Sequence, residues 1–423
     1  MFLKRVFSIK SVSDFIYMFF SNLVKKGFGF VREVILAYVF GSSLIYSFYI
    51  LLKTIVDIFS QFTFGNALQA NLLPKLSKHF EEHNNVSYFN LFSFTKRSLI
   101  YIFIISLIVQ LIIIWRLNTQ YTFVLILLAC LLSILLLFNV FNSVFLTVLQ
   151  AEGRFKDYSY ATAFNLFIAT ILVYPFSIIF NIIGPVVSRL AGAILLMNKY
   201  LIPILKRKKS NEVDIGIYDF SFSVLLLGNL PNIIIMLSRF ISGTDGDNTI
   251  AYFNYAIVLL NVVLTAIIAN LNTLMLRKLS ISKDIKWLIY SFFISLFCGA
   301  ILYLFVFNFS DEFIRLVYFR GAFTLVDLAE TSQYFQQMTG AIIILLISSV
   351  LLQPYFTLDL KLRRKYSSKL LFVTLGFIFS LLIVLFSFEI DARIRSLIFL
   401  YFMSFTTLML SIFTCIKYIK NEN

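Results

Sequence analysis

The sequence predicts an all-α integral membrane protein of about twelve transmembrane helices, in two pseudo-symmetric six-helix lobes around a central cavity. Three observations support this fold class: an excess of apolar residues, the placement of the basic residues, and a weak doubling of the chain. Hydrophobic residues make up 60% and charged residues 13% of the 423 residues, against roughly 45–50% and about 25% in soluble domains. One globular core cannot bury so much apolar surface. A soluble enzyme, a disordered chain and a nucleic-acid-binding domain are therefore excluded.

Twelve segments are apolar over a length that can cross a bilayer, which takes about 20 residues. The gaps between them are too short for a soluble domain, and the longest lie near 76–97 and 309–332. In chain order the predicted spans are 14–40, 44–70, 98–115, 121–149, 159–180, 184–205, 217–240, 249–276, 286–308, 333–357, 368–388 and 394–417.

The net charge of +15 is concentrated in alternate loops between these spans. Cytoplasmic loops of membrane proteins carry an excess of Lys and Arg, so this alternation predicts that both termini are cytoplasmic. The basic loops contain Lys75, Lys78, Lys96, Arg97, Arg154, Lys156, Lys206, Arg207, Lys208, Lys209, Arg277, Lys278, Lys283, Lys286, Lys361, Arg363, Arg364, Lys365 and Lys369. The opposite side has only Arg116, Arg189, Arg239, Arg315, Arg320, Arg393 and Arg395. The charge thus indicates membrane topology and not a nucleic-acid partner.

The chain also resembles a doubled unit. The basic run 206–209 lies near its midpoint, and the segments 73–80 and 274–283 place basic residues at corresponding points of the two halves. Six helices in each half give both halves the same orientation, as in parallel repeats that enclose a site. We therefore predict an N-terminal lobe over 1–209 and a C-terminal lobe over 210–423.

Metal and cofactor sites have little support. Cys130, Cys298 and Cys415 are scattered in apolar runs, and His79 and His83 lie in a polar loop without an HExxH pattern. These patterns favour neither a zinc site nor a disulfide framework, and we expect no cofactor. The basic N-terminus has no cleavage site, so we expect no removable signal peptide.

Charged residues inside predicted spans are the candidates for function. A central Lys or Arg costs about 2.5–3.5 kcal/mol on insertion scales, so such residues usually face a cavity, pair with another charge or bind a substrate. Basic groups outnumber acids, which favours an anionic ligand, and Lys and Arg suit a phosphate or diphosphate. The candidates are Lys25, Lys26, Arg32 and Lys53 for the substrate, and Glu33 and Asp57 as ion, proton or structural partners.

Sequence spacing leaves alternatives open for each of them. Lys25 either joins Arg32 on one helical face, seven residues away, or ends a shorter helix and reaches the interface. Lys53 and Asp57 are four residues apart and can neutralise each other; otherwise Asp57 can receive a proton or cation. Arg32 and Glu33 are adjacent, so we expect them to point apart and to need separate partners.

Glycine and proline mark two further places. Gly27 and Gly29 lie between the basic residues of the first span and permit a bend or a close approach. Asn229, Pro231 and Asn232 interrupt the seventh span. They predict a hinge or ion site, or more simply a packing kink in which neighbouring polar groups reuse a freed carbonyl.

Four segments together resemble the MurJ/MviN lipid II flippases, a branch of the multidrug/oligosaccharidyl-lipid/polysaccharide (MOP) exporter superfamily. They are spread over most of the chain, and the last is the most specific because it matches an LLFxRGAFTxxD pattern. The segments are GFGFVREVILAYVFGSS (27–43), LQAEGRFKDYSYATAFN (149–165), IAYFNYAIVLLNVVLTAIIANLNTLMLRKLS (250–280) and RLVYFRGAFTLVDLAETSQYF (315–335).

The resemblance implies roles for some residues, whereas at other positions this sequence departs from the family pattern. A first-helix arginine of the family corresponds to Lys26, its RD pair to Arg32 and Glu33, and a common basic position to Lys53. Other charged positions of the family are lost, at Ser47, Phe59, Ser60, Ile257 and Val258. The twelve predicted spans are also two fewer than lipid II flippases typically carry.

The resemblance implies a non-enzymatic flippase in the bacterial cytoplasmic (inner) membrane. Its implied substrate is an undecaprenyl-diphosphate-linked glycan, either lipid II or a polysaccharide or O-antigen repeat unit, moved by alternating access. Membrane lipids and a coupling cation or the membrane potential are the implied partners. Three alternatives stay open: a cation-coupled multidrug exporter of the same superfamily, a membrane glycosyltransferase or polymerase, and a non-transporting scaffold.

Overall fold

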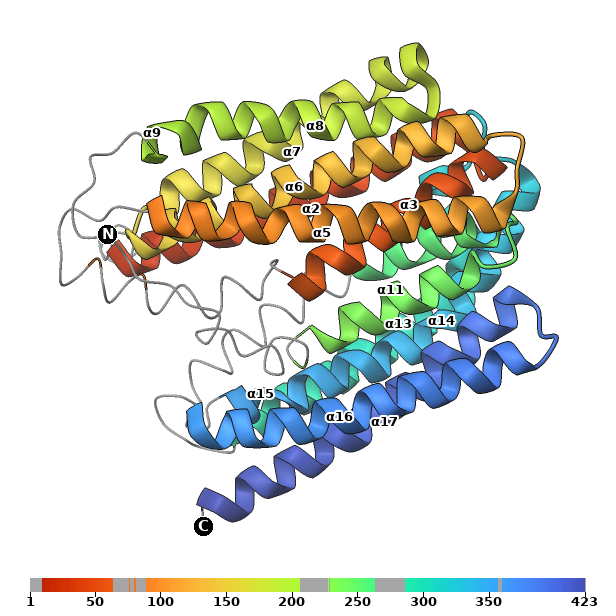
Figure 1. The fold of residues 1–423 in the computed structure, drawn as a ribbon. Helices are drawn as coiled ribbons and strands as arrows, with labels where there is room; N and C mark the ends of the chain where they lie inside the picture. The colour runs from red at the N-terminus through yellow and green to blue at the C-terminus, as the bar shows by residue number, and fades with distance from the viewer. Residues whose placement is uncertain are drawn as a thin grey trace, which may run out of the picture. The chain divides into compact units, whose positions relative to one another are not determined.

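The computed structural model describes residues 10–63, 89–205, 229–262, 286–356 and 360–422, and the single positions 76, 80 and 227. Every regular element in these residues is a helix (Figure 1). His79, His83 and the basic segments 206–209 and 274–283 lie outside the described residues, so the predictions made for them stay predictions.

The helices confirm the predicted fold class. Each of the twelve predicted spans overlaps a helix in the described residues. Seven helices there are long and apolar enough to cross a membrane, and two shorter apolar ones cover Leu230–Ser242 and Thr249–Val262. The seven spans are Thr95–Leu117, Thr122–Ala151, Phe155–Tyr200, Lys286–Tyr318, Leu325–Tyr355, Ser368–Ser387 and Ala392–Lys417. The chain is a multi-pass membrane protein.

The chain divides into two compact units. The first contains Met1–Val39 and Ile55–Ser221, and the second contains Phe40–Thr54 and Phe222–Asn423. The turn after the first helix and most of the second helix therefore group with the C-terminal part of the chain. The lobe boundary predicted at residue 209 lies outside the described residues.

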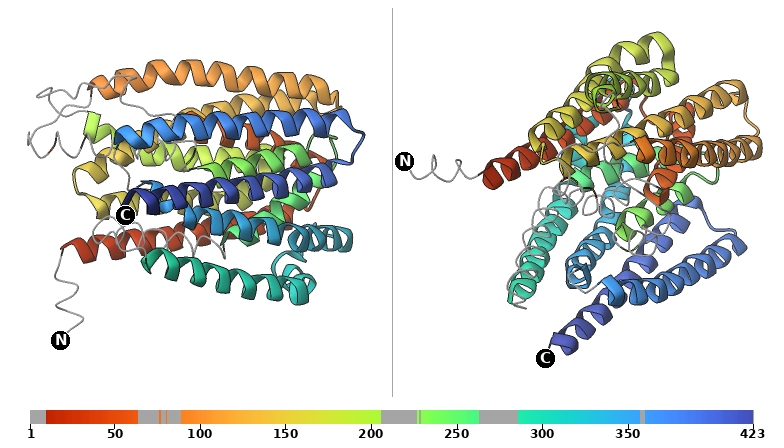
Figure 2. Two further views of the ribbon diagram at one scale, coloured as in Figure 1. Left: turned by 90° about the horizontal axis from the view of Figure 1, so that it is seen from below. Right: turned by 60° about the vertical axis from the view of Figure 1, so that its left-hand side comes forward.

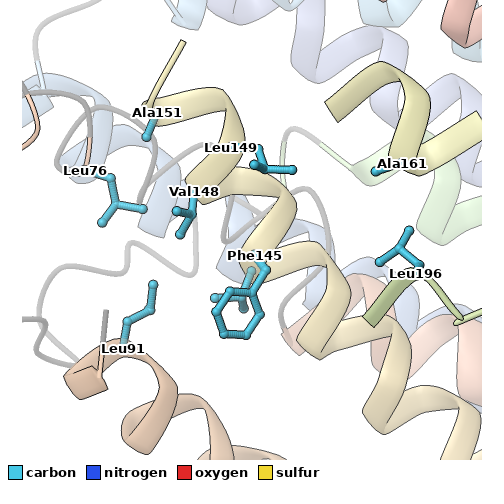
Figure 3. Close-up of a cluster of buried hydrophobic side chains, with 9 residues drawn as sticks. Leu76, Leu91, Phe145, Val148, Leu149, Ala151, Ala161 and Leu196 are labelled. Carbon is cyan, nitrogen blue, oxygen red and sulfur yellow. The ribbon is translucent and has the colours of Figure 1, made fainter. Parts of the chain in front are cut away.

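The first unit contains most of the helices of the N-terminal half. They are α2 (Lys10–Phe40), the end of α3 (Leu44–Thr63), α5 (Phe89–Leu117), α6 (Thr122–Ala151), α7 (Phe155–Phe180), η1 (Asn181–Ile183), α8 (Gly184–Leu196), η2 (Met197–Leu201) and α9 (Ile202–Leu205). Buried apolar side chains of α6, α7 and α8 form one cluster with Leu76 and Leu91 (Figure 3).

Close backbone contacts at small residues and interhelical hydrogen bonds hold these apolar helices together. Lipid is as apolar as the helix surfaces, so small residues and hydrogen bonds contribute much of helix association in a membrane. A Cβ added at Gly192 of α8 would lie 2.6 Å from the carbonyl oxygen of Asn165 on α7. Gln110 Nε2 donates to Ser133 Oγ at 2.9 Å, which ties α5 to α6.

The second unit contains the beginning of α3 and the C-terminal helices. They are α11 (Leu230–Ser242), the helix Thr249–Val262, α13 (Lys286–Tyr318), α14 (Leu325–Leu351), α15 (Gln353–Phe356), α16 (Leu360–Ser387) and α17 (Ala392–Glu422). α14 packs against both α13 and α17. α16 and α17 lie side by side, joined by the short connection 388–391 (Figure 2).

Ion pairs fasten the start of α17 to two other elements. Arg393 Nη1 lies 2.6 Å from Glu330 Oε2 on α14. Arg395 Nη1 lies 3.1 Å from Asp245 Oδ1, in the turn after α11, and the backbone N–H of Ala392 donates to the same carboxylate at 2.9 Å. The connections that follow α11 and precede α14 and α17 therefore lie at one end of this unit.

Candidate functional site

Arg32 and Glu33 form an ion pair on α2. Arg32 Nη2 donates to Glu33 Oε1 at 3.1 Å, and the two side chains are 13% and 4% exposed. The prediction that adjacent residues would need separate partners is therefore wrong for this contact. The arginine side chain is long enough to fold back along the helix, and pairing lowers the cost of burying both charges.

Lys25 and Lys26 lie on the preceding turns of α2. Lys25 Nζ lies 4.8 Å from the centre of the Tyr158 ring on α7, a distance at which a cation is attracted to an aromatic face. Lys26 is exposed. Beside them, Thr170 Oγ1 donates to the carbonyl of Phe28 at 3.2 Å, so α2 and α7 are joined where Gly27 and Gly29 flank that carbonyl.

Lys53 is a buried cation on α3. The residue is 6% exposed, and its Nζ lies 5.9 Å from the centre of the Tyr49 ring, one turn earlier. Asp57 follows one turn later and is partly buried. Arg32, Lys25 and Lys26 belong to the first unit and Lys53 to the second. Their common role in one substrate site stays a proposal, as does a pairing of Lys53 with Asp57.

Asn229 and Pro231 mark a helix start. Leu227 is helical, Asn229 lies in a turn, and α11 begins at Leu230 with Pro231 in its first turn. Proline costs little there, because the first N–H groups of a helix have no intrahelical partner. Asn229 is buried in the turn before α11, and Asn232 is exposed. Residues 217–226 and 228 lie outside the described residues, so the expected kink stays a prediction. Whether it binds an ion stays a prediction.

A group of contacts that the sequence did not predict joins three of the segments that carry the family resemblance. Ser42 Oγ, in the turn between α2 and α3, donates to Asp327 Oδ1 at the start of α14. Tyr255 Oη donates to the carbonyl of Gly41. We call Gly41, Ser42, Tyr255 and Asp327 the turn clasp. These segments match the family in separate parts of the sequence, and no periodicity relates residues that far apart, so only the structure shows that they meet.

Arg239, at the edge of the predicted span 217–240 and among the basic residues expected on the opposite side, is a buried cation. It lies in the last turn of α11 and is 8% exposed. Its Nη1 donates to Asn254 Oδ1, on the helix Thr249–Val262, at 3.0 Å. A residue at the edge of a predicted span is expected to be exposed near a loop, but in the second unit Arg239 is buried and bonded to Asn254.

The described residues contain no group of three or more His, Cys, Asp or Glu side chains that could hold a metal ion. Cys130, Cys298 and Cys415 are free thiols.

Comparisons with known proteins identify the fold. No family model matches the chain, and no curated protein matches it. Among solved structures, a lipid II flippase MurJ in an inward closed conformation matches with a TM-score of 0.70 and 16% identity, covering 95% of this chain and 87% of that one. The chain has the fold of the MOP-superfamily transporters.

MATE structures, one of them a multidrug resistance transporter of the MOP superfamily, match with lower TM-scores. An inward-facing MATE transporter of the MOP superfamily gives a TM-score of 0.55 at 15% identity, covering 97% of this chain and 96% of that one. A MATE structure in a straight conformation gives 0.57 at 14% identity, with 96% and 95% covered. These likenesses concern the fold, and the substrate has to be argued from the residues.

Proposed function

We propose that this protein is a flippase that moves an undecaprenyl-diphosphate-linked glycan across the bacterial cytoplasmic membrane by alternating access. The glycan is lipid II or a polysaccharide or O-antigen repeat unit. The protein performs no covalent chemistry on it. Both termini lie in the cytoplasm in this proposal, in keeping with the alternation of basic loops.

The observation that carries the proposal is the presence of buried cations on the first two apolar helices. Arg32 and Lys53 are largely buried, with a 13% exposed side chain and a 6% exposed residue respectively. Lys26 is exposed on the same helix as Arg32, and Lys25 lies beside Tyr158. Charge inside apolar helices is costly and is usually functional. The structure that matches with a TM-score of 0.70 is that of a lipid II flippase, which supports a lipid-linked diphosphate as the ligand.

In the proposed mechanism, Arg32, Lys26 and Lys53 bind the diphosphate. A guanidinium can contact two phosphate oxygens at once, and an ammonium acts as a compact point charge. The diphosphate competes with Glu33 for Arg32, so binding loosens an ion pair that otherwise neutralises this arginine. The prenyl tail stays in lipid while the glycan crosses an aqueous path. The membrane potential or a coupling cation drives the return.

Replacement of Arg32 tests this role. We expect Arg32→Ala to reduce flipping by about 10- to 100-fold, the loss expected for one or two charge-assisted hydrogen bonds. Arg32→Lys should retain part of the activity because the charge remains but the two-pronged contact does not. Arg154→Ala is the control, because Arg154 is an exposed arginine paired with Asp157 at the start of α7. Full activity of Arg32→Ala at a normal protein level would refute the role.

Depletion of the protein identifies the substrate. Accumulation of lipid II would favour the peptidoglycan precursor, and accumulation of undecaprenyl-linked repeat units would favour a surface polysaccharide. If neither accumulates, the flippase proposal is wrong.

The second candidate is a cation-coupled multidrug exporter. The MATE structures cover nearly the whole chain, and Glu33 is a buried acid of the kind that binds a proton or cation. This candidate predicts that deletion changes drug sensitivity and leaves lipid-linked intermediates unchanged. The excess of basic over acidic residues on α2 favours the flippase.

A further inference from the structure

The turn between α2 and α3 is fitted closely to the loop that precedes α14. Gly41 has φ +54°, a region that glycine adopts readily and other residues rarely adopt. A Cβ at this position would lie 2.4 Å from the carbonyl oxygen of Ala322. The turn can therefore approach the loop only with glycine at position 41.

The carboxylate of Asp327 serves two elements at once. Its Oδ2 accepts the backbone N–H of Thr324 at 2.8 Å, and its own N–H donates to Thr324 Oγ1 at 3.3 Å. These reciprocal bonds form a capping box, which fixes the start of a helix. Its Oδ1 accepts the hydroxyl of Ser42. Asp327 is 5% exposed, so loss of the carboxylate would leave buried donors unsatisfied.

An aromatic row leads from the turn clasp to Lys53. The ring of Tyr255, whose hydroxyl binds Gly41, stacks on Tyr46 with centres 5.6 Å apart and planes at 12°. Tyr46 lies 5.9 Å from Tyr49, and Lys53 Nζ lies 5.9 Å from the Tyr49 ring. Positions 46, 49 and 53 recur on one helical face. All these residues belong to the second unit.

We propose that Asp327 is a positioning residue for Lys53. Asp327 holds the α2–α3 turn through Ser42 and so fixes the position of the beginning of α3 within the second unit. The contacts along the aromatic row from Tyr255 through Tyr46 and Tyr49 then fix the position of Lys53. The C-terminal unit thus sets where a cation from the N-terminal half of the sequence is presented. The inference rests on the proposed function for its effect on flipping, but the position of Lys53 can be measured without any substrate.

The first experiment measures that position by chemical modification. Lys53→Cys is made in a chain whose native Cys130, Cys298 and Cys415 are replaced by alanine, and its rate of reaction with a methanethiosulfonate reagent is recorded in membranes. We expect Asp327→Ala to raise the rate roughly tenfold, since losing a charge-assisted hydrogen bond shifts a local equilibrium by about that factor. Ser42→Ala should raise it less, because the capping box stays intact.

The matched control is Glu330→Ala. Glu330 lies one turn after Asp327 on α14. Its replacement removes an ion pair with Arg393, but neither Glu330 nor Arg393 belongs to the turn clasp. We expect its rate to equal that of the parent. Asp327→Asn should restore part of the protection, because its single amide oxygen can accept from Ser42 but its amide nitrogen cannot accept the Thr324 N–H. Equal rates in Asp327→Ala and Glu330→Ala, in protein of unchanged thermal stability, would overturn the proposal.

The second experiment separates this inference from the proposed function. Flipping is measured in Lys53→Ala, Asp327→Ala and the double variant. If Asp327 acts through Lys53, the double variant loses little more than Lys53→Ala alone, whereas Asp327→Ala combined with Arg32→Ala shows multiplied losses. If the losses of flipping in Asp327→Ala and Lys53→Ala also multiply in their double variant, the positioning role is contradicted. If Lys53→Ala flips normally, the role of Lys53 in the proposed function is wrong, and the modification rates still decide the positioning.

Discussion

At the scale of the residue, the Arg32–Glu33 pair is the most informative contact in the first unit. The pair places opposite charges 3.1 Å apart in a largely buried position, where each partner lowers the cost of burying the other. An anionic substrate would displace the acid from the arginine, whereas a coupling cation would displace the arginine from the acid. The same contact therefore discriminates between the two candidate functions.

Glu33→Gln provides that test. In a flippase the amide still accepts a hydrogen bond from Arg32, so we expect flipping to stay within about threefold of the parent, with a stability loss of about 1 kcal/mol. In a cation-coupled exporter the loss of the acid should abolish drug efflux. Flipping and drug efflux are measured in parallel with thermal unfolding. Loss of flipping in stable protein would assign Glu33 a role that the proposed mechanism does not give it.

At the scale of the element, glycines of two different kinds occur in the apolar helices. A Cβ at Gly27 or Gly29 of α2 would have no atom within 4 Å, whereas a Cβ at Gly192 of α8 would lie 2.6 Å from the Asn165 carbonyl. Packing requires glycine at position 192. At positions 27 and 29 a larger side chain would fit, so packing does not require glycine there. The remaining reason for glycine at these positions is the backbone freedom that it gives.

Alanine substitutions should separate these uses. Gly29→Ala should raise the stability of α2 by up to about 1 kcal/mol, the usual gain for alanine over glycine in a helix, and should slow flipping if α2 bends. Gly192→Ala should lower the melting temperature and the protein level. Thermal unfolding in detergent and a flipping assay measure both effects. Unchanged flipping in a more stable Gly29→Ala protein would show that a bend at this residue is not used.

At the scale of the whole molecule, four of the loops that the charge alternation assigns to one side lie together in the second unit. The turn 41–43 contacts the start of α14 through the turn clasp. Asp245, after α11, contacts Arg395 after the 388–391 connection. A miscounted helix between these loops would have placed them at opposite ends, so the contacts support the predicted order of spans.

Labelling can determine which side of the membrane this end faces. We predict that Asp391→Cys, in a chain without native cysteines, reacts with an impermeant maleimide in intact cells. Ser210→Cys, next to the basic run 206–209, should react only after the membrane is opened. The reverse pattern would invert the proposed topology and place both termini outside.

The sequence alone determined the class of the molecule and the approximate positions of its helices in the described residues. Apolar length and loop charge can be read from local composition, because bilayers have similar thickness and basic residues are enriched in cytoplasmic loops. That is why the twelve predicted spans overlap helices. Burial of charge in such spans also singled out Arg32 and Lys53 without a structure.

Only the tertiary structure decided which residues meet. Local spacing suggested that Arg32 and Glu33 would point apart, but a long side chain folded back to form their ion pair. Ser42 and Asp327 are 285 positions apart in the chain, and no periodicity relates residues at that separation. Their contact depends on a glycine turn that fits against another loop and on a buried carboxylate that two elements share. Such a fit is a property of packed surfaces, and it placed the beginning of α3 with the C-terminal unit.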